Sequence, residues 1–249
     1  MRNSRRKYAL GILLAVIAIC IVWRPWQSRL AVIRKGGKGP PTIVLLHGYA
    51  SSADQWIPFT QSIPFPPQGR FLLPQAPKTT LRTDNAPEGR EWWDLDLAAY
   101  LRPGRNGVDL ARENPRGLER AARQVRSLLW AEGNSYDHPF ILGGFSQGAM
   151  VAGQIAFASD EPLAALVILS GTPINEANWR IGFARRKGLP VFMSHGRNDD
   201  ILPFDLAERL HAEIEAAGLP VIFVPFVGGH EIPAEVVIAL GRFLGQIKQ

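Results

Sequence analysis

The stretch ILGGFSQGAM, residues 141–150, carries the strongest indication of the fold in this chain. Within it, residues 144–148 (Gly-Phe-Ser-Gln-Gly) fit the pattern Gly-x-Ser-x-Gly. In that pattern a strand turns sharply into a helix and a serine hydroxyl is presented at the bend. Five residues match by chance easily enough that the pattern alone is only suggestive. The sequence on either side must therefore supply a strand, a helix and partners for Ser146.

Apolar runs of strand length recur along the chain and alternate with stretches of helical spacing. The runs are TIVLLHG (42–48), RFLLPQAP (70–77), HPFILGG (138–144), LAALVILSG (163–171), LPVFMSHG (189–196) and LPVIFVPF (219–226). Helices are predicted over 115–132, 148–159, 205–217 and 233–245, and a Gly/Pro-rich linker over 35–41. Strands buried on both faces and alternating with helices predict a parallel sheet covered by helices on both sides.

Histidine and carboxylate candidates lie beyond the predicted strand ends, where chemistry gathers in such sheets. A serine hydroxyl needs a base, and the base needs a group that orients it. His230, in a glycine-flanked loop after the last strand, is the predicted base for Ser146. In this architecture the order along the chain is serine, acid, histidine. The pattern HG-x-x-D favours Asp199 as the acid, with its neighbour Asp200 as the alternative.

Two further histidines, His47 and His195, each precede a glycine at a strand end, where an imidazole often bonds loop backbone. Backbone amides for an oxyanion hole are expected from Gln147, at the start of the helix, and from Tyr49, in the loop after the first strand. Apolar residues near the strand ends suggest a small to medium acyl group; they are Phe145, Trp92, Trp93 and Ile201.

Composition excludes several other classes of function. The chain has 249 residues and a net charge of +6, carried largely by scattered arginines. They indicate a solvated helix face over 112–126, or attraction to anionic lipid or acidic substrates. No nucleic-acid module is visible. The single cysteine, Cys20, excludes a disulfide framework, a cysteine-cluster metal site and, because it lies outside the candidate domain, a cysteine nucleophile.

The first residues have the composition of a membrane segment. Arg2, Arg5, Arg6 and Lys7 precede an uncharged apolar run over 8–23. We expect an uncleaved signal anchor over 1–29, or a cleaved signal peptide as the alternative, followed by a catalytic domain over 30–249. The basic start favours an extracytoplasmic catalytic domain anchored to the membrane. Secretion after cleavage is the alternative localisation.

Several stretches together resemble the phospholipase/carboxylesterase family of α/β-hydrolases, which includes the acyl-protein thioesterases. They are LLHGYASSADQW, LLPQAP, EWWDLD, GGFSQGAM, LSGTP, SHGRNDDILP and GGHEIP, within residues 41–247. The resemblance implies an α/β-hydrolase fold and a monomeric or homodimeric serine hydrolase of esters and thioesters, without metal or organic cofactor. It implies Ser146 as nucleophile, Asp199 as acid and His230 as base, with the amides of Tyr49 and Gln147 as the oxyanion hole. Trp93 matches an aromatic residue near the family's acyl site, and packing is the other interpretation.

The chain departs from the family in two ways. Familiar members are cytosolic and lack an anchor, and the stretch over 98–118 differs from the expected lid-like segment. The leading hypothesis is a serine carboxylic-ester hydrolase for short- to medium-chain acyl esters or thioesters. A narrower hypothesis is a lysophospholipase or acyl-protein thioesterase at the membrane surface, with a lipid ester as substrate. An acyltransferase is a third hypothesis, and a catalytically silent, membrane-tethered binding module with the hydrolase fold is a fourth.

Overall fold

The structure is a computed structural model, and it describes residues 30–80, 89–96 and 107–247. The predicted anchor over 1–29 lies outside these residues. In the three described ranges, no helix combines the length and the apolar character that crossing a membrane requires.

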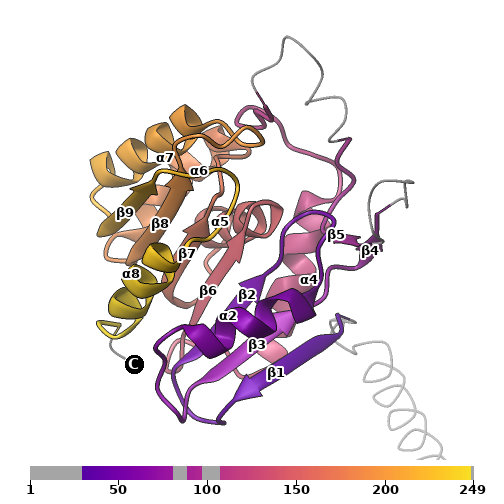
Figure 1. Ribbon diagram of the computed structural model, residues 1–249, viewed down its shortest axis with the longest axis vertical. Coiled ribbons are helices and arrows are strands. Elements are labelled where there is room, and N and C mark those ends of the chain that lie inside the picture. The colour runs from indigo at the N-terminus through magenta and orange to yellow at the C-terminus, as the bar shows by residue number, and fades with distance from the viewer. Residues whose placement is uncertain (1–29, 81–88, 97–106, 248–249) are drawn as a thin grey trace, which may run out of the picture.

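A seven-stranded sheet forms the centre of the described chain, with the order β1-β3-β2-β6-β7-β8-β9 (Figure 1). Every neighbouring pair is parallel except β1 with β3. The strands are β1 (Val32–Gly36), β2 (Thr42–Leu46), β3 (Arg70–Pro74), β6 (Phe140–Phe145), β7 (Leu163–Leu169), β8 (Val191–Gly196) and β9 (Val221–Phe226). The predicted parallel sheet is confirmed, and each predicted apolar run contains one of its strands except that β6 extends one residue beyond its run, to Phe145.

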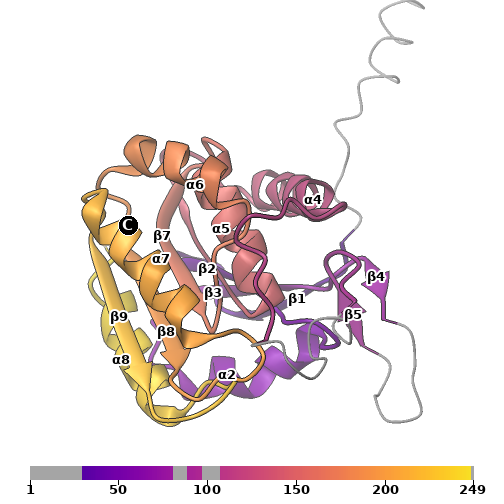
Figure 2. The ribbon, with the colours of Figure 1, turned by 90° about the horizontal axis from the view of Figure 1, so that it is seen from above.

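Helices cover both faces of this sheet (Figure 2). The helices are α2 (Ile57–Ser62), α4 (Leu118–Ala131), α5 (Gln147–Ala158), α6 (Glu176–Phe183), α7 (Phe204–Ala216) and α8 (Ala234–Leu244). Buried side chains of α4, α5, α6 and α7 belong to one apolar cluster, and those of α8 belong to the other. This is the α/β-hydrolase architecture that the sequence predicts.

The strands alternate their side chains between these two clusters, as the period of two in a strand requires. On β2, Val44 packs into the cluster under α5, whereas Ile43 and Leu45 pack into the cluster under α8. On β6, Leu142 and Ile141 divide in the same way. Because both faces are covered, every residue of β2 is buried, which explains the unbroken apolar runs in the sequence.

Some elements differ from the prediction. The segment expected as a linker over 35–41 begins inside β1, which pairs antiparallel with β3 and forms an edge of the sheet. A short sequence that is mostly exposed on an edge strand lacks the apolar run that identified the inner strands. The helix over 176–183 and the small pair β4 (Lys78–Thr79) and β5 (Arg90–Glu91) were likewise not predicted.

Candidate active site

Ser146 stands at the junction of β6 and α5. Its backbone has φ 55° and ψ −121°, a conformation that side chains with a Cβ rarely adopt. The flanking glycines explain how the bend closes. A Cβ on Gly144 would lie 2.4 Å from the carbonyl carbon of Gly148, and one on Gly148 would lie 2.2 Å from the carbonyl oxygen of Leu46. The Gly-x-Ser-x-Gly pattern is therefore a steric requirement of this sharp strand-to-helix turn.

The loops after β8 and β9 bring Asp199 and His230 together at the same edge of the sheet (Figure 1). The Nδ1 atom of His230 lies 2.7 Å from Oδ2 of Asp199, so the ring donates a hydrogen bond to the carboxylate. Asp199 is 8% exposed, whereas Asp200 is exposed and has no contact with His230 in the described residues. Of the two neighbouring carboxylates, the geometry pairs Asp199 with the imidazole.

The carboxylate of Asp199 is held in its charged form. Its Oδ1 accepts hydrogen bonds from the backbone amides of Ile201 at 3.0 Å and Leu202 at 2.9 Å. Burial by itself would raise the pKa of Asp199. The hydrogen bonds from His195, His230 and Leu202 outweigh burial and hold the pKa well below its usual range. Asp199 is thus a buried, permanently ionised acceptor for the ring of His230.

Phe145 connects the serine bend to the histidine loop. Its ring and that of His230 have centroids 4.8 Å apart, and Phe145 directly precedes Ser146. Among the described side chains, no hydrogen bond joins the Ser146 hydroxyl to His230. Such bonds are often long before substrate is bound, so the arrangement is compatible with proton transfer between the two groups.

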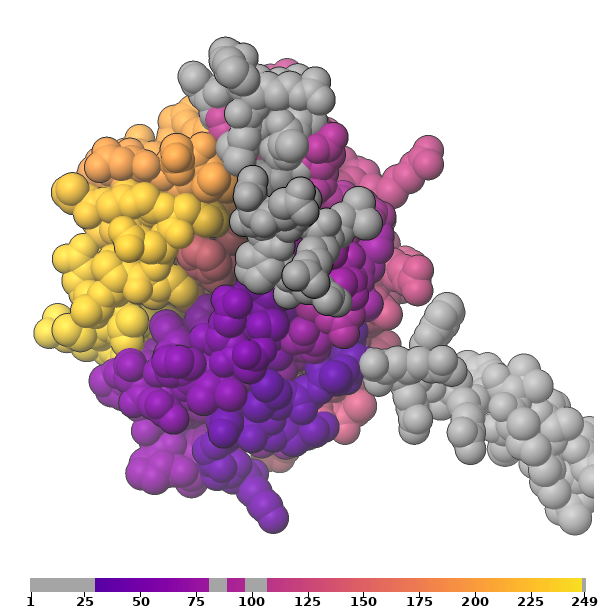
Figure 3. Space-filling model, turned by 45° about the vertical axis from the view of Figure 1, so that its right-hand side comes forward, coloured from indigo at the N-terminus to yellow at the C-terminus, as the bar shows by residue number. Residues whose placement is uncertain are grey.

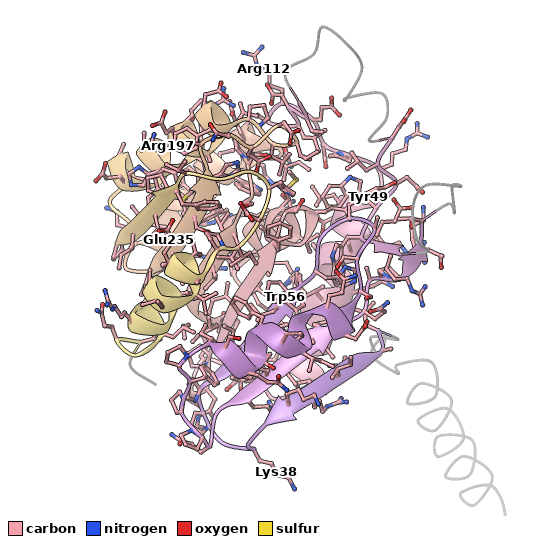
Figure 4. The ribbon with its side chains drawn as sticks, in the orientation of Figure 1. Lys38, Tyr49, Trp56, Arg112, Arg197 and Glu235 are labelled. Carbon is pink, nitrogen blue, oxygen red and sulfur yellow. The ribbon has the colours of Figure 1, made fainter. Side chains whose placement is uncertain are left out.

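His47 organises the loop that contains Tyr49. Its Nδ1 donates to the carbonyl of Gly48 at 2.8 Å, and its Nε2 accepts from the backbone amide of Ala76 at 3.1 Å. Burial is the main cause that lowers the pKa of His47 to about 4, so the ring is neutral at pH 7. The predicted role of His47, bonding loop backbone, is confirmed. Tyr49 follows this fixed peptide at the end of β2 (Figure 4).

The side chain of Gln147 makes contacts that the sequence did not reveal. As the first residue of α5, it has a backbone amide without an intrahelical acceptor. Its side-chain oxygen accepts from the amide of Trp92 at 2.8 Å, and its side-chain nitrogen donates to the carbonyl of Trp93 at 3.0 Å. Trp92 in turn donates through Nε1 to the carbonyl of His47 at 2.8 Å. The segment with both tryptophans is therefore bonded to Gln147 and, through the His47 carbonyl, to the loop that contains Tyr49.

Trp93 is fully buried in the apolar cluster under α5, beside helix α4. The prediction that it contacts substrate stays a prediction. Phe145 is half-buried and lines a cavity, and its predicted contact with the acyl group likewise stays a prediction.

A cavity of about 140 Å³ opens next to the bend. Its lining residues are His47, Gly48, Ser51, Gln55, Trp56, Phe145 and Ile232. In Figure 3, atoms from the middle of the chain reach the surface between the violet N-terminal segments and the yellow C-terminal segment. Trp56, labelled in Figure 4, lies just before α2 on the cavity wall. The cavity combines a mostly apolar wall with the loop that contains Tyr49.

Within the described ranges, no three histidine, cysteine, aspartate or glutamate side chains gather as a metal site needs. Cys20 lies outside these ranges. The expected absence of metal and organic cofactors stays a prediction.

The profile of the family described as Phospholipase/Carboxylesterase matches residues 27–247. The chain belongs to the phospholipase/carboxylesterase family. Acyl-protein thioesterase 1 of Cryptococcus neoformans is 27% identical over 173 residues, which cover 68% of this chain and 70% of that protein. The Schizosaccharomyces pombe protein of the same name is 26% identical over 208 residues, 81% of this chain and 88% of its own length.

Solved structures of family members have the same fold. The crystal structure of esterase PE8 is 28% identical, has a TM-score of 0.72 and covers 88% of this chain and 99% of that chain. The structure of Zea mays acyl-protein thioesterase 2 is 23% identical with a TM-score of 0.68, covers 88% and 98% of the two chains, and supports the fold alone. The chain is a serine hydrolase of the carboxylesterase and thioesterase type. A catalytically silent binding module is not favoured.

The predicted localisation, a membrane anchor with an extracytoplasmic catalytic domain, is wrong, and so is secretion after cleavage. The curated relatives bear the name acyl-protein thioesterase, and the family resemblance implies a cytosolic protein. The apolar run over 8–23 is also shorter than the roughly 20 residues that span a bilayer. Basic residues flank both of its ends, so their distribution was a weak guide to orientation.

Proposed function

We propose that this protein hydrolyses carboxylic esters through a catalytic triad of Ser146, His230 and Asp199. The observation that carries the proposal is the hydrogen bond of 2.7 Å between the buried Asp199 carboxylate and the His230 ring. That ring contacts Phe145, the residue next to the strained Ser146. A hydroxyl at a sharp bend, a base and an ionised orienting acid are the components of nucleophilic acyl transfer.

In the proposed reaction, the Ser146 oxygen attacks the carbonyl carbon of the ester while Nε2 of His230 accepts the serine proton. Collapse of the tetrahedral intermediate breaks the bond to the leaving alcohol, which takes the proton from the imidazolium. Water then attacks the acyl-enzyme with His230 again as base, and the acid is released. Asp199 keeps the proton of Nδ1 in place and stabilises the imidazolium.

The developing negative charge on the carbonyl oxygen needs donors that are already in position. We assign these to the backbone amides of Tyr49 and Gln147. The bond from His47 to the Gly48 carbonyl fixes the peptide that contains the Tyr49 amide. The Gln147 amide stands at the N-terminus of α5, where the helix dipole favours an anion. Neither donor has to reorient as charge builds up.

The cavity beside Phe145 supports a short- to medium-chain acyl group. Because a cavity of about 150 Å³ holds a benzene molecule, a volume near 140 Å³ suits roughly six carbons. Trp56 and Ile232 would contact the end of such a chain. A long-chain lysophospholipid exceeds this volume, so it is the less favoured substrate. Thioesters are the second substrate class, since the curated relatives bear the name acyl-protein thioesterase.

We assign the catalytic domain to residues 30–249, and the family match over 27–247 supports this assignment. The monomeric or homodimeric state stays a prediction.

The proposed nucleophile is tested with Ser146→Ala and with Ser62→Ala as a matched control. Ser62 is an exposed serine that bonds the carbonyl of Pro58 at 3.0 Å. Ser146→Ala should lose turnover of p-nitrophenyl butyrate by a factor on the order of 10⁶ and should not react with a fluorophosphonate probe. Ser62→Ala should keep both the turnover and the reaction with the probe, and circular dichroism should show the same fold in the two variants. Full turnover in folded Ser146→Ala would refute the proposal.

A further inference from the structure

His195 is a second histidine at the carboxylate of Asp199. It lies in β8, is completely buried and is in contact with the loop that carries Asp199. Its Nε2 lies 2.8 Å from the carbonyl oxygen of Leu202 and 3.2 Å from Oδ2 of Asp199. The same Oδ2 accepts the hydrogen bond from His230. One carboxylate oxygen thus lies between two imidazole rings, one from strand β8 and one from the loop after β9.

The surroundings of His195 determine which ring nitrogen carries the proton. Both neighbours of Nε2 are oxygen atoms that only accept hydrogen bonds, so Nε2 must be protonated. Nδ1 is buried and, among the residues that the structure describes, has no hydrogen-bond partner. A second proton there would lack an acceptor. The N–H of Nε2 therefore lies between the Leu202 carbonyl and Asp199.

The hydrogen bonds of Asp199 show what this N–H contributes. Oδ1 receives two backbone amides, those of Ile201 and Leu202, and this pair holds one side of the carboxylate. Oδ2 accepts the hydrogen bond from His230 and lies 3.2 Å from Nε2 of His195, whose N–H also points to the Leu202 carbonyl. Without His195, Oδ2 would keep a single donor, the His230 ring that Asp199 is meant to orient, and the amides at Oδ1 would be the other restraint on rotation about the Cβ–Cγ bond.

We propose that His195 is a positioning residue that holds Oδ2 of Asp199 in the direction from which it orients the His230 ring. The proposal rests on the proposed function, because it assigns His195 a role only through the Asp199–His230 pair. The hydrogen bond of His195 to the Leu202 carbonyl also stabilises the loop, and this structural role is distinct from the proposed one. A residue that only stabilises the loop would affect folding and stability, whereas a positioning residue also affects the step in which His230 transfers the proton.

The test uses two substitutions in the full chain. His195→Phe keeps a planar ring and removes the donor, and His195→Gln keeps an N–H donor near the position of Nε2. We expect kcat for p-nitrophenyl butyrate to fall about tenfold in His195→Phe, equal to about 1.4 kcal/mol, with KM within twofold of wild type. His195→Gln should restore kcat to within about threefold. His211→Phe, in α7 against the ring of Phe223, is the matched histidine control and should leave both constants unchanged.

A spectroscopic measurement on the wild-type protein accompanies the kinetics. In protein with ¹⁵N-labelled histidine, the resonance lost in His195→Gln should belong to a ring protonated at Nε2. The low-field proton of the His230–Asp199 bond should shift or broaden in His195→Phe and return in His195→Gln. If His195→Phe does not fold, protonated Nε2 together with the kcat of His195→Gln supports the proposal.

Two results would overturn it: a His195 ring protonated at Nδ1, or folded His195→Phe with kcat within twofold of wild type. An inactive wild-type enzyme that the fluorophosphonate probe does not label would instead refute the proposed function.

Discussion

Acidification should destabilise the fold through His47, a group buried in the wall of the cavity. In the folded protein its Nε2 accepts a hydrogen bond from the Ala76 amide, and burial lowers its pKa to about 4 from the ordinary 6.5. Between these two pH values, the unfolded chain binds a proton at His47 that the folded chain does not bind. The contribution of His47 to the free energy of unfolding is therefore fully present above about pH 7. It declines as the pH falls through 6.5 and stops declining below about pH 4.

The size of the effect follows from the two pKa values of His47. At about 1.4 kcal/mol for each pKa unit, the difference between 6.5 and about 4 corresponds to a maximum of about 3 kcal/mol. At pH 5 the loss attributable to His47 is about 2 kcal/mol, because the unfolded histidine is nearly fully protonated and the folded one is not. This loss is a large fraction of a typical domain's stability.

Urea unfolding at pH 7 and pH 5 measures this loss when wild type is compared with His47→Gln, whose side chain does not titrate. The free energy of unfolding should fall by about 2 kcal/mol more in wild type than in the variant. Other titrating groups, including Asp199, are present in both proteins and cancel in the comparison. The exposed His138 supplies the control, since His138→Gln should lose as much as wild type. Equal losses in wild type and His47→Gln would refute the reasoning.

Two further substitutions test the serine bend and the cavity. Gly148→Ala places a Cβ 2.2 Å from the Leu46 carbonyl oxygen and should lower the free energy of unfolding by at least about 2 kcal/mol. Gly245→Ala is the control and should change it little, because its Cβ would have no contact closer than 3.5 Å. Equal urea midpoints for the two variants would contradict this expectation. Ile232→Ala enlarges the cavity and should shift kcat/KM from p-nitrophenyl butyrate and hexanoate toward decanoate, whereas the exposed Ile222→Ala should keep the wild-type order of esters. An unchanged order of esters in Ile232→Ala would place the acyl chain elsewhere.

The inner part of the fold could be predicted because its residues have one clear chemical character. Strands buried on both faces, such as β2 and β6, must be apolar throughout, so composition alone reveals them. Edge strand β1 has exposed positions over Arg34–Gly36 and gives no such pattern. Its place depends on pairing with β3, a partner distant in sequence. Helix α6 is likewise short and has only three buried residues.

For the candidate site, the sequence located the loops but not the contacts. The spacing after β8 favoured Asp199 over Asp200, and in the structure Asp199 is the one within hydrogen-bonding distance of His230. His195 was expected to bond loop backbone, and it does so through the Leu202 carbonyl. Its approach to Asp199 could not be foreseen, because it depends on how tightly the loop folds back over the strand end. The assigned catalytic roles stay predictions.

The bonds between Gln147 and the tryptophan segment have a consequence for how this enzyme can vary. Both bonds end on main-chain atoms of Trp92 and Trp93, so they do not depend on which side chains the segment carries. Stretches of the chain on either side of the segment can therefore change in length and composition while it stays docked on α5. Such an attachment keeps the segment fixed to the first residue of α5 through the segment's main-chain atoms alone.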